Sequence, residues 1–171
     1  MKRLKSGLPL TVLALLAALL TTACLSPSSG NAKSALRRLG RQEPSAKLDP
    51  GDVVRIQMEA LKYNDEENRG IEIVYRFASP ANKRNTGPLP RFIRMLDGEA
   101  YRPLLNHAQA EYGEVELAGN LAAQRVSLTS SDGLIAVYIF VLSRQRSGDC
   151  DGCWMTDSVM VEAMQRLGGT V

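Results

Sequence analysis

The residues best suited to chemistry are the two cysteines of the run Cys150-Asp151-Gly152-Cys153. Two cysteines at this spacing exchange electrons when a helix N-terminus or a cation favours the thiolate, whereas Asp149 and Asp151 work against it. A closed zinc site needs four ligands, and beyond this pair the chain offers one histidine plus carboxylates. We therefore expect a structural disulfide, with two reduced cysteines as the alternative, and no metal site.

The chain has a single histidine, His107, at the start of a predicted strand. A lone histidine is typically an ordinary polar residue at a surface or an edge, and no proton relay can be drawn without a partner. We therefore predict no catalytic residue. Rings with polar tips suit a ligand pocket and the rim of a core equally well. The candidate pocket residues are Tyr75, Tyr101, His107, Tyr112, Tyr138, Trp154 and Asp157.

A secretion leader is predicted at the N-terminus. A basic start is followed by the uncharged apolar run Leu8 to Leu20, and Leu20-Thr21-Thr22-Ala23-Cys24 ends it. This ending resembles the bacterial lipobox, in which the cysteine sulfur receives a diacylglycerol, although Thr21 stands where leucine is usual. Cleavage by an ordinary signal peptidase is the alternative. An uncleaved anchor is disfavoured because the apolar core is shorter than the roughly 20 residues of a spanning helix.

The net charge belongs largely to this leader. Loss of residues 1–23 removes Lys2, Arg3 and Lys5 and leaves equal numbers of basic and acidic residues. The sequence pI of 8.9 is therefore no sign of a basic surface on the mature chain. We exclude nucleic acid as a partner, since such binding requires a broad basic surface.

The rest of the chain is long enough for one domain. Leu25 to Lys47 is rich in Ser, Gly, Pro and basic residues and predicts a linker, whose arginines are an alternative contact for phospholipid head groups. The expected organisation is a signal peptide over 1–23, a lipidated Cys24 with a flexible linker over 24–48, an α+β domain over 49–164 and a tail over 165–171.

Three helices are expected after the linker. Asp49-Pro50 is typical of a helix cap and first turn. Pro80 and Gly98 end the second and third helices, and a polar loop over 81–87 separates them. Apolar residues recur at helical spacing in each segment. These stripes are Val54, Met58 and Leu61; Ile71, Val74, Phe77 and Ala78; and Leu89, Phe92, Ile93 and Leu96.

The apolar period then changes to about two, which predicts strands. Asp132-Gly133 is the clearest hairpin signal. The segment from Leu134 to Leu142 is apolar on both faces apart from Tyr138, which indicates a central strand. The four predicted strands are His107 to Leu117, Leu121 to Thr129, Leu134 to Ser143 and Cys153 to Ala163.

Three helices followed by a strand meander predict an α+β fold, with the helices on one face of a curved four-stranded antiparallel sheet. The segments FASPAN over 77–82 and GCWMTDSV over 152–159, with Phe92 and Met95, are similar to the family called domain of unknown function 4864. The resemblance spans 49–161. It implies a nuclear-transport-factor-2-like cone with a cavity at its wide end. No catalytic residue is established for that family, so the resemblance implies none.

These observations favour a membrane-tethered, non-enzymatic module of the cell envelope on the periplasmic side, which binds a small apolar ligand or scaffolds an envelope protein. The residue after the cysteine is Leu25 and not the aspartate that retains a lipoprotein in the inner membrane, which favours sorting to the outer membrane. One alternative is an isomerase or hydrolase that uses Asp157 with Tyr138 or Tyr75. Another is protein–protein association, including a homodimer, through the open sheet face. No cofactor is expected.

Overall fold

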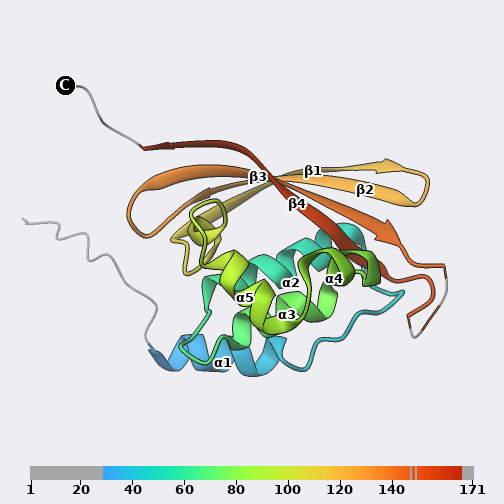
Figure 1. Ribbon diagram of the computed structural model, residues 1–171, viewed down its shortest axis with the longest axis horizontal. Helices are drawn as coiled ribbons and strands as arrows, with labels where there is room; N and C mark the ends of the chain where they lie inside the picture. Colours follow the sequence, from blue (N-terminus) through green and yellow to red (C-terminus); the bar gives the residue numbers. More distant parts are fainter. Residues whose placement is uncertain (1–28, 147, 149, 167–171) are drawn as a thin grey trace, which may run out of the picture.

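The computed structural model describes residues 29–146, 148 and 150–166. Within them, the helices lie on one face of a four-stranded antiparallel sheet (Figure 1), which confirms the predicted α+β class. The signal peptide, Cys24 and residues 167–171 lie outside the described residues. The elements are α1 (Ser29–Leu39), α2 (Pro50–Lys62), α3 (Arg69–Phe77), α4 (Pro80–Thr86), α5 (Leu89–Leu96), η1 (Arg102–Leu104), β1 (Gln109–Ala118), β2 (Leu121–Thr129), β3 (Leu134–Arg144) and β4 (Trp154–Arg166).

The sheet is a simple meander in the order β1-β2-β3-β4, as the sequence predicted. Leu134 opens β3 after the turn at Gly133, whose φ of 82° favours glycine. The inner face of β3 is buried at Ala136, Tyr138 and Phe140. The last strand continues to Arg166, two residues into the segment predicted as a tail, because its pairing with β3 runs on to Leu134.

Helix α2 begins as predicted. Asp49 caps it, with its Oδ1 accepting a hydrogen bond from the Asp52 amide at 2.8 Å. The Asp49 amide donates in return to Asp52 Oδ2 at 3.2 Å, which completes a capping box. The predicted stripe of Val54, Met58 and Leu61 is buried. Helix α2 therefore packs its apolar face into the core.

The second and third predicted helices correspond to α3 and α5. Ile71 and Phe77 of α3 are fully buried, and Phe92 of α5 lies in the same core. Ile93 is half-buried and packs at the edge of that core. Both helices therefore bury most of their predicted apolar stripes in the core.

The prediction of a polar loop over 81–87 is wrong, because most of this segment forms α4. Ser79 caps this helix by accepting a hydrogen bond from the Asn82 amide at 3.1 Å, and Pro80 occupies the first turn. The helix is short and has no apolar stripe, so it left no periodic signal. Its fold depends on local capping and on contacts with β4.

The segment predicted as a flexible linker over 24–48 differs from the structure over its described part. Residues 29–39 form α1, which lies farther from the sheet than the other labelled helices (Figure 1). Leu36 and Leu39 are 5% and 1% exposed. Arg76 anchors the following turn, since its guanidinium donates to the Gly40 and Gln42 carbonyls at 2.9 Å each. This segment is therefore part of the folded domain.

The turn between β3 and β4 contains the predicted disulfide. Cys150 and Cys153 are bonded, with Cα atoms 5.5 Å apart, which confirms the pairing. The Gln145 amide donates to the Cys153 carbonyl, and the Gly152 amide donates to the Gln145 carbonyl, both at 2.8 Å. The disulfide therefore braces a turn that already carries backbone hydrogen bonds.

Candidate functional site

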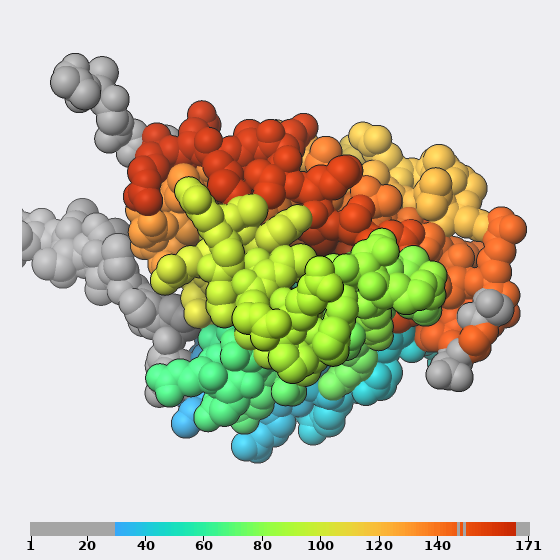
Figure 2. All heavy atoms as spheres, viewed as in Figure 1, coloured from blue at the N-terminus to red at the C-terminus, as the bar shows by residue number. Residues whose placement is uncertain are grey.

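A cavity of about 180 Å³ lies between the helices and the inner face of the sheet. Helices α2 to α5, the η1 turn and strands β3 and β4 all contribute to its lining. Figure 2 shows the side of the molecule on which α5 and the following loop lie against β4. Most of the wall is apolar. Its apolar side chains include Leu61, Val74, Phe92, Met95, Leu96 and Phe140.

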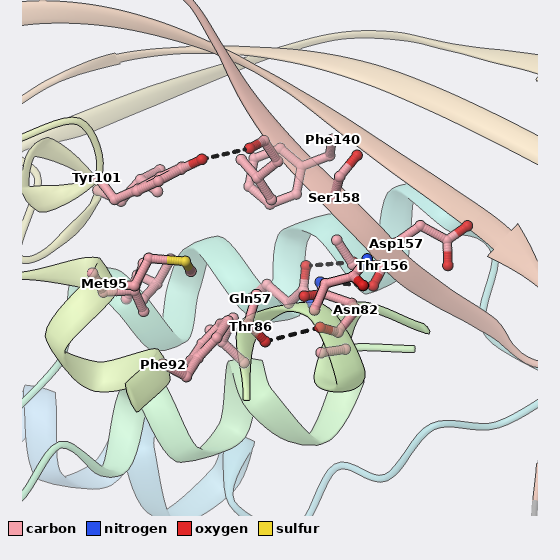
Figure 3. A pocket seen from close by; sticks show the side chains of 17 residues that line it. Gln57, Asn82, Thr86, Phe92, Met95, Tyr101, Phe140, Thr156, Asp157 and Ser158 are labelled. Carbon is pink, nitrogen blue, oxygen red and sulfur yellow. Dashed lines mark hydrogen bonds between the residues drawn. The ribbon is translucent and has the colours of Figure 1, made fainter. Parts of the chain in front are cut away.

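One end of the cavity is closed by a buried polar cluster of Gln57, Asn82 and Thr156 (Figure 3). The Thr156 hydroxyl donates to Gln57 Oε1 at 2.9 Å. Asn82 Nδ2 donates to the Thr156 carbonyl at 3.0 Å, and the Ser79 amide donates to the same carbonyl at 2.9 Å. Helix α2, the start of α4 and strand β4 are therefore joined at one point.

Gln57 has a donor left over in this cluster. The side chain is 1% exposed, and its Nε2 has no hydrogen-bond partner among the described residues. A buried donor without a partner costs about 1–3 kcal/mol, so native proteins rarely retain one. Gln57 also lines the cavity. The free amide nitrogen is thus a candidate contact for a bound molecule.

None of the three polar residues in this cluster was predicted as a site residue. A signal for Gln57 existed, because it lies on the α2 face that carries Val54 and Leu61 and is the polar member of that stripe. Asn82 and Thr156 lie inside the FASPAN and GCWMTDSV segments. These two segments, which carry the family resemblance, meet at the closed end of the cavity.

Two of the predicted pocket residues, Tyr101 and Asp157, line the cavity. Tyr101 extends its ring along the wall, and its hydroxyl donates to the Val159 carbonyl at 3.1 Å (Figure 3). Asp157 lies where the register between β3 and β4 shifts, and its carboxylate points away from the cavity (Figure 3). Asp157 therefore borders the cavity without presenting its charge to the interior.

The tyrosines considered as partners of Asp157 are occupied elsewhere. Tyr138 is fully buried, its hydroxyl donates to the Ala100 carbonyl at 2.9 Å, and burial raises its pKa. Tyr75 packs its ring on Phe92 at 5.3 Å, and its hydroxyl donates to the Gly87 carbonyl at 3.1 Å. The described geometry does not bring either hydroxyl together with the Asp157 carboxylate inside the cavity.

The remaining pocket candidates lie away from the cavity lining. His107 is buried and not at the surface, and its Nδ1 lies 2.8 Å from the Leu104 carbonyl. Burial lowers the pKa of this histidine, and the nearby Lys62 lowers it further. Tyr112 is 37% exposed on β1 beneath the Arg55 guanidinium, and Trp154 packs at the rim of the core. These three side chains have structural roles in the described fold.

The cavity interior offers few charges. Among the described residues that line it, Asp157 is the only acidic one, and no lysine, arginine or histidine contributes. Among the described residues, no group of three or more His, Cys, Asp or Glu side chains is placed to hold a metal ion. The site is therefore suited to holding a neutral molecule.

The outer face of the sheet, opposite the helices, is partly apolar. Met160 of β4 is 48% exposed beside Ile139 of β3. An ion pair of Arg125 with Glu162, at 2.6 Å, crosses the same face. Association through this face, with a second copy or another protein, stays a prediction.

The family described as "Domain of unknown function (DUF4864)" matches residues 45–167. No curated protein and no solved structure matches the chain. The matched span includes the cavity, the polar cluster and the disulfide turn, and it covers well over half of the sequence. The chain therefore belongs to the family of this domain of unknown function.

Proposed function

We propose that the protein is an exported, membrane-tethered module that binds a small apolar ligand in the cavity. The cavity itself carries the proposal. It is similar in size to a cavity of about 150 Å³ that holds one benzene molecule, and its wall is built mainly from apolar side chains. A ligand of about one ring, or a short chain, fits this space.

Binding without catalysis is supported by how the polar groups of the lining are used. The Tyr101 and Thr156 hydroxyls donate to a backbone carbonyl and to Gln57, and the Asp157 carboxylate points away. General acid–base catalysis needs a base within hydrogen-bond reach of the reacting proton. The lining is arranged for holding a molecule in place. A cavity between helices and sheet also supports the proposed kinship with nuclear-transport-factor-2-like cones.

Filling the cavity should weaken this binding. Met95 is half-buried and lines the cavity, so the larger ring of Met95→Trp can enter the space that the ligand needs. We expect binding of α-methylstyrene, measured by titration calorimetry, to weaken by about tenfold or more. Met160→Trp is the matched control, because Met160 is exposed on β4 and does not line the cavity. It should change the affinity by less than about twofold.

Equal affinity in the wild-type protein and in Met95→Trp would contradict the cavity as the binding site, provided that both have the same circular dichroism spectrum. Native mass spectrometry is a second test, because it detects a small molecule that stays bound to the purified protein. A bound small molecule present in the wild-type protein and absent from Met95→Trp would identify the natural ligand.

The membrane tether is part of the same proposal and follows from the leader and Cys24. Helix α1 begins five residues after Cys24, and five extended residues span at most about 18 Å. A lipid on Cys24 would hold the domain close to the bilayer. The cations Lys33, Arg37 and Arg41, which are exposed on and after α1, would then lie near the lipid head groups.

Cys24→Ser should release the protein from the membrane. In a bacterial host, the wild-type chain is expected in the membrane fraction, with an intact mass that shows loss of residues 1–23 and gain of acyl chains. The Cys24→Ser chain should lack the acyl mass and appear in the soluble fraction. Wild-type protein that is cleaved but carries no lipid would refute the tether and leave the cavity proposal standing.

A further inference from the structure

We propose that the ligand carries a neutral hydrogen-bond acceptor, such as a ketone, aldehyde or ester oxygen, and that Gln57 Nε2 donates to it. This inference rests on the proposed function and names its ligand class. Among the described side chains that line the cavity, one has a buried polar atom without a hydrogen-bond partner, and this atom is Gln57 Nε2. An acceptor on the ligand would supply the hydrogen bond that the protein does not.

The Gln57 amide joins the polar cluster through its oxygen. Its Oε1 accepts from the Thr156 hydroxyl, which leaves the nitrogen as the free end. Thr156 is itself fixed, because its carbonyl accepts from both Asn82 and Ser79. The backbone of Gln57 belongs to α2, whose neighbouring Met58 is fully buried. A donor held this firmly selects for an acceptor at a defined place.

The charge of the lining favours a neutral acceptor over a carboxylate. The described lining contains no cation, and a buried carboxylate without one is strongly disfavoured. The two cations of α4, Lys83 and Arg84, do not line the cavity. The Lys83 Nζ lies 5.2 Å from the Tyr75 ring centroid and donates to the Arg76 carbonyl. A carbonyl oxygen accepts from the amide without needing a counter-charge.

The other buried polar atom without a partner does not compete with this assignment. Gln124 Oε1 also lacks a hydrogen-bond partner among the described residues. Gln124 lies on β2, its Nε2 donates to the Gly113 carbonyl at 2.9 Å, and it does not line the cavity. Only Gln57 therefore combines an unpartnered donor with a place in the cavity wall of the described structure.

The test compares two probes of nearly equal shape on the wild-type protein. Acetophenone carries a carbonyl oxygen where α-methylstyrene carries a methylene carbon. We expect acetophenone to bind about tenfold more tightly, and benzoate to bind more weakly than either. In Gln57→Met, which keeps the length of the side chain and removes the donor, the two neutral probes should bind within about twofold of each other.

The outcomes separate this inference from the proposed function. If both neutral probes bind the wild-type protein with equal affinity, the cavity binds ligands but the role of Gln57 is refuted. If benzoate binds more tightly than the neutral probes, the ligand's acceptor is not neutral. If Gln57→Met still prefers acetophenone to the same degree, Gln57 is not the donor. If neither neutral probe binds, the proposed function fails with it. The wild-type comparison decides the matter even where the variant does not fold.

Discussion

Leu39→Ala is expected to lower the free energy of unfolding by about 3 kcal/mol. Leu39 is 1% exposed and belongs to the main core, although it lies in a segment whose composition predicts a linker. Truncating a buried leucine removes its transfer free energy and leaves a cavity that the surrounding side chains fill only in part. Urea unfolding followed by circular dichroism measures the loss. The midpoint should fall while the slope stays the same.

Arg37→Ala is the control for this experiment, because Arg37 lies on the same helix and is exposed. Its effect should stay within about 0.5 kcal/mol, as for most surface substitutions. If Leu39→Ala is as mild as Arg37→Ala, α1 contributes nothing to the core and residues 29–39 act as a linker after all.

Gly70→Ala is expected to cost about 3 kcal/mol or more, or to prevent accumulation of folded protein. A Cβ atom on Gly70 would lie 2.2 Å from the Ala60 carbonyl oxygen and 2.9 Å from Asn64 Oδ1. The first of these is a backbone atom in the last turn of α2, so the two helices must separate to make room. Asn64 Oδ1 also accepts from the Ile71 amide at 3.1 Å, and that bond would be strained as well. Thermal unfolding of the purified variant measures the effect.

Gly30→Ala is the matched control, since Gly30 lies in α1 and none of the described residues comes within 4 Å of an added Cβ. Alanine favours a helix over glycine by up to about 1 kcal/mol, so this variant should be neutral or slightly more stable. A Gly70→Ala protein with an unchanged unfolding temperature would show that α2 and α3 do not approach as closely as described.

The strands were predictable because their signals are local. The alternation of β2, the apolar run of β3 and the Asp132-Gly133 turn are each contained in one short segment of the sequence. Their predicted bounds match the observed strands to within three residues at every end. Helix α2 was predictable for the same reason, since Asp49 and Pro50 mark its start.

The two helices that the sequence did not reveal lack a clear apolar period, although Ser79 and Pro80 mark the start of α4. Helix α1 has three buried apolar residues in a polar segment, and it is stabilised by packing on α2 and α3 and by the ion pair of Arg38 with Glu59. Helix α4 buries only Asn82, a polar residue. Both depend on tertiary contacts with distant segments, which periodicity does not record.

The candidate site was predictable in part, since Tyr101 and Asp157, two of the predicted pocket residues, line the cavity. Its polar cluster was not, because the partners are distant in sequence. Gln57 and Thr156 are 99 residues apart, and nothing in either segment indicates the other. Tyr138 was predicted as a pocket residue but lies in the core. An aromatic ring with a polar tip suits a pocket, but here the backbone carbonyl of Ala100 satisfies its hydroxyl within the core.

The bonds that fix Thr156 and Val159 also limit how this sheet can grow. Strand β4 is at the edge of the sheet, and an edge strand with free backbone groups can recruit a strand from another molecule. The Thr156 carbonyl is taken by Ser79 and Asn82, and the Val159 carbonyl is taken by the Tyr101 hydroxyl. Because these carbonyls already accept hydrogen bonds, the half of β4 beside the cavity is less able to pair with a strand of another molecule or to form fibril-like assemblies. Substitution of Tyr101 would reopen one of these acceptors.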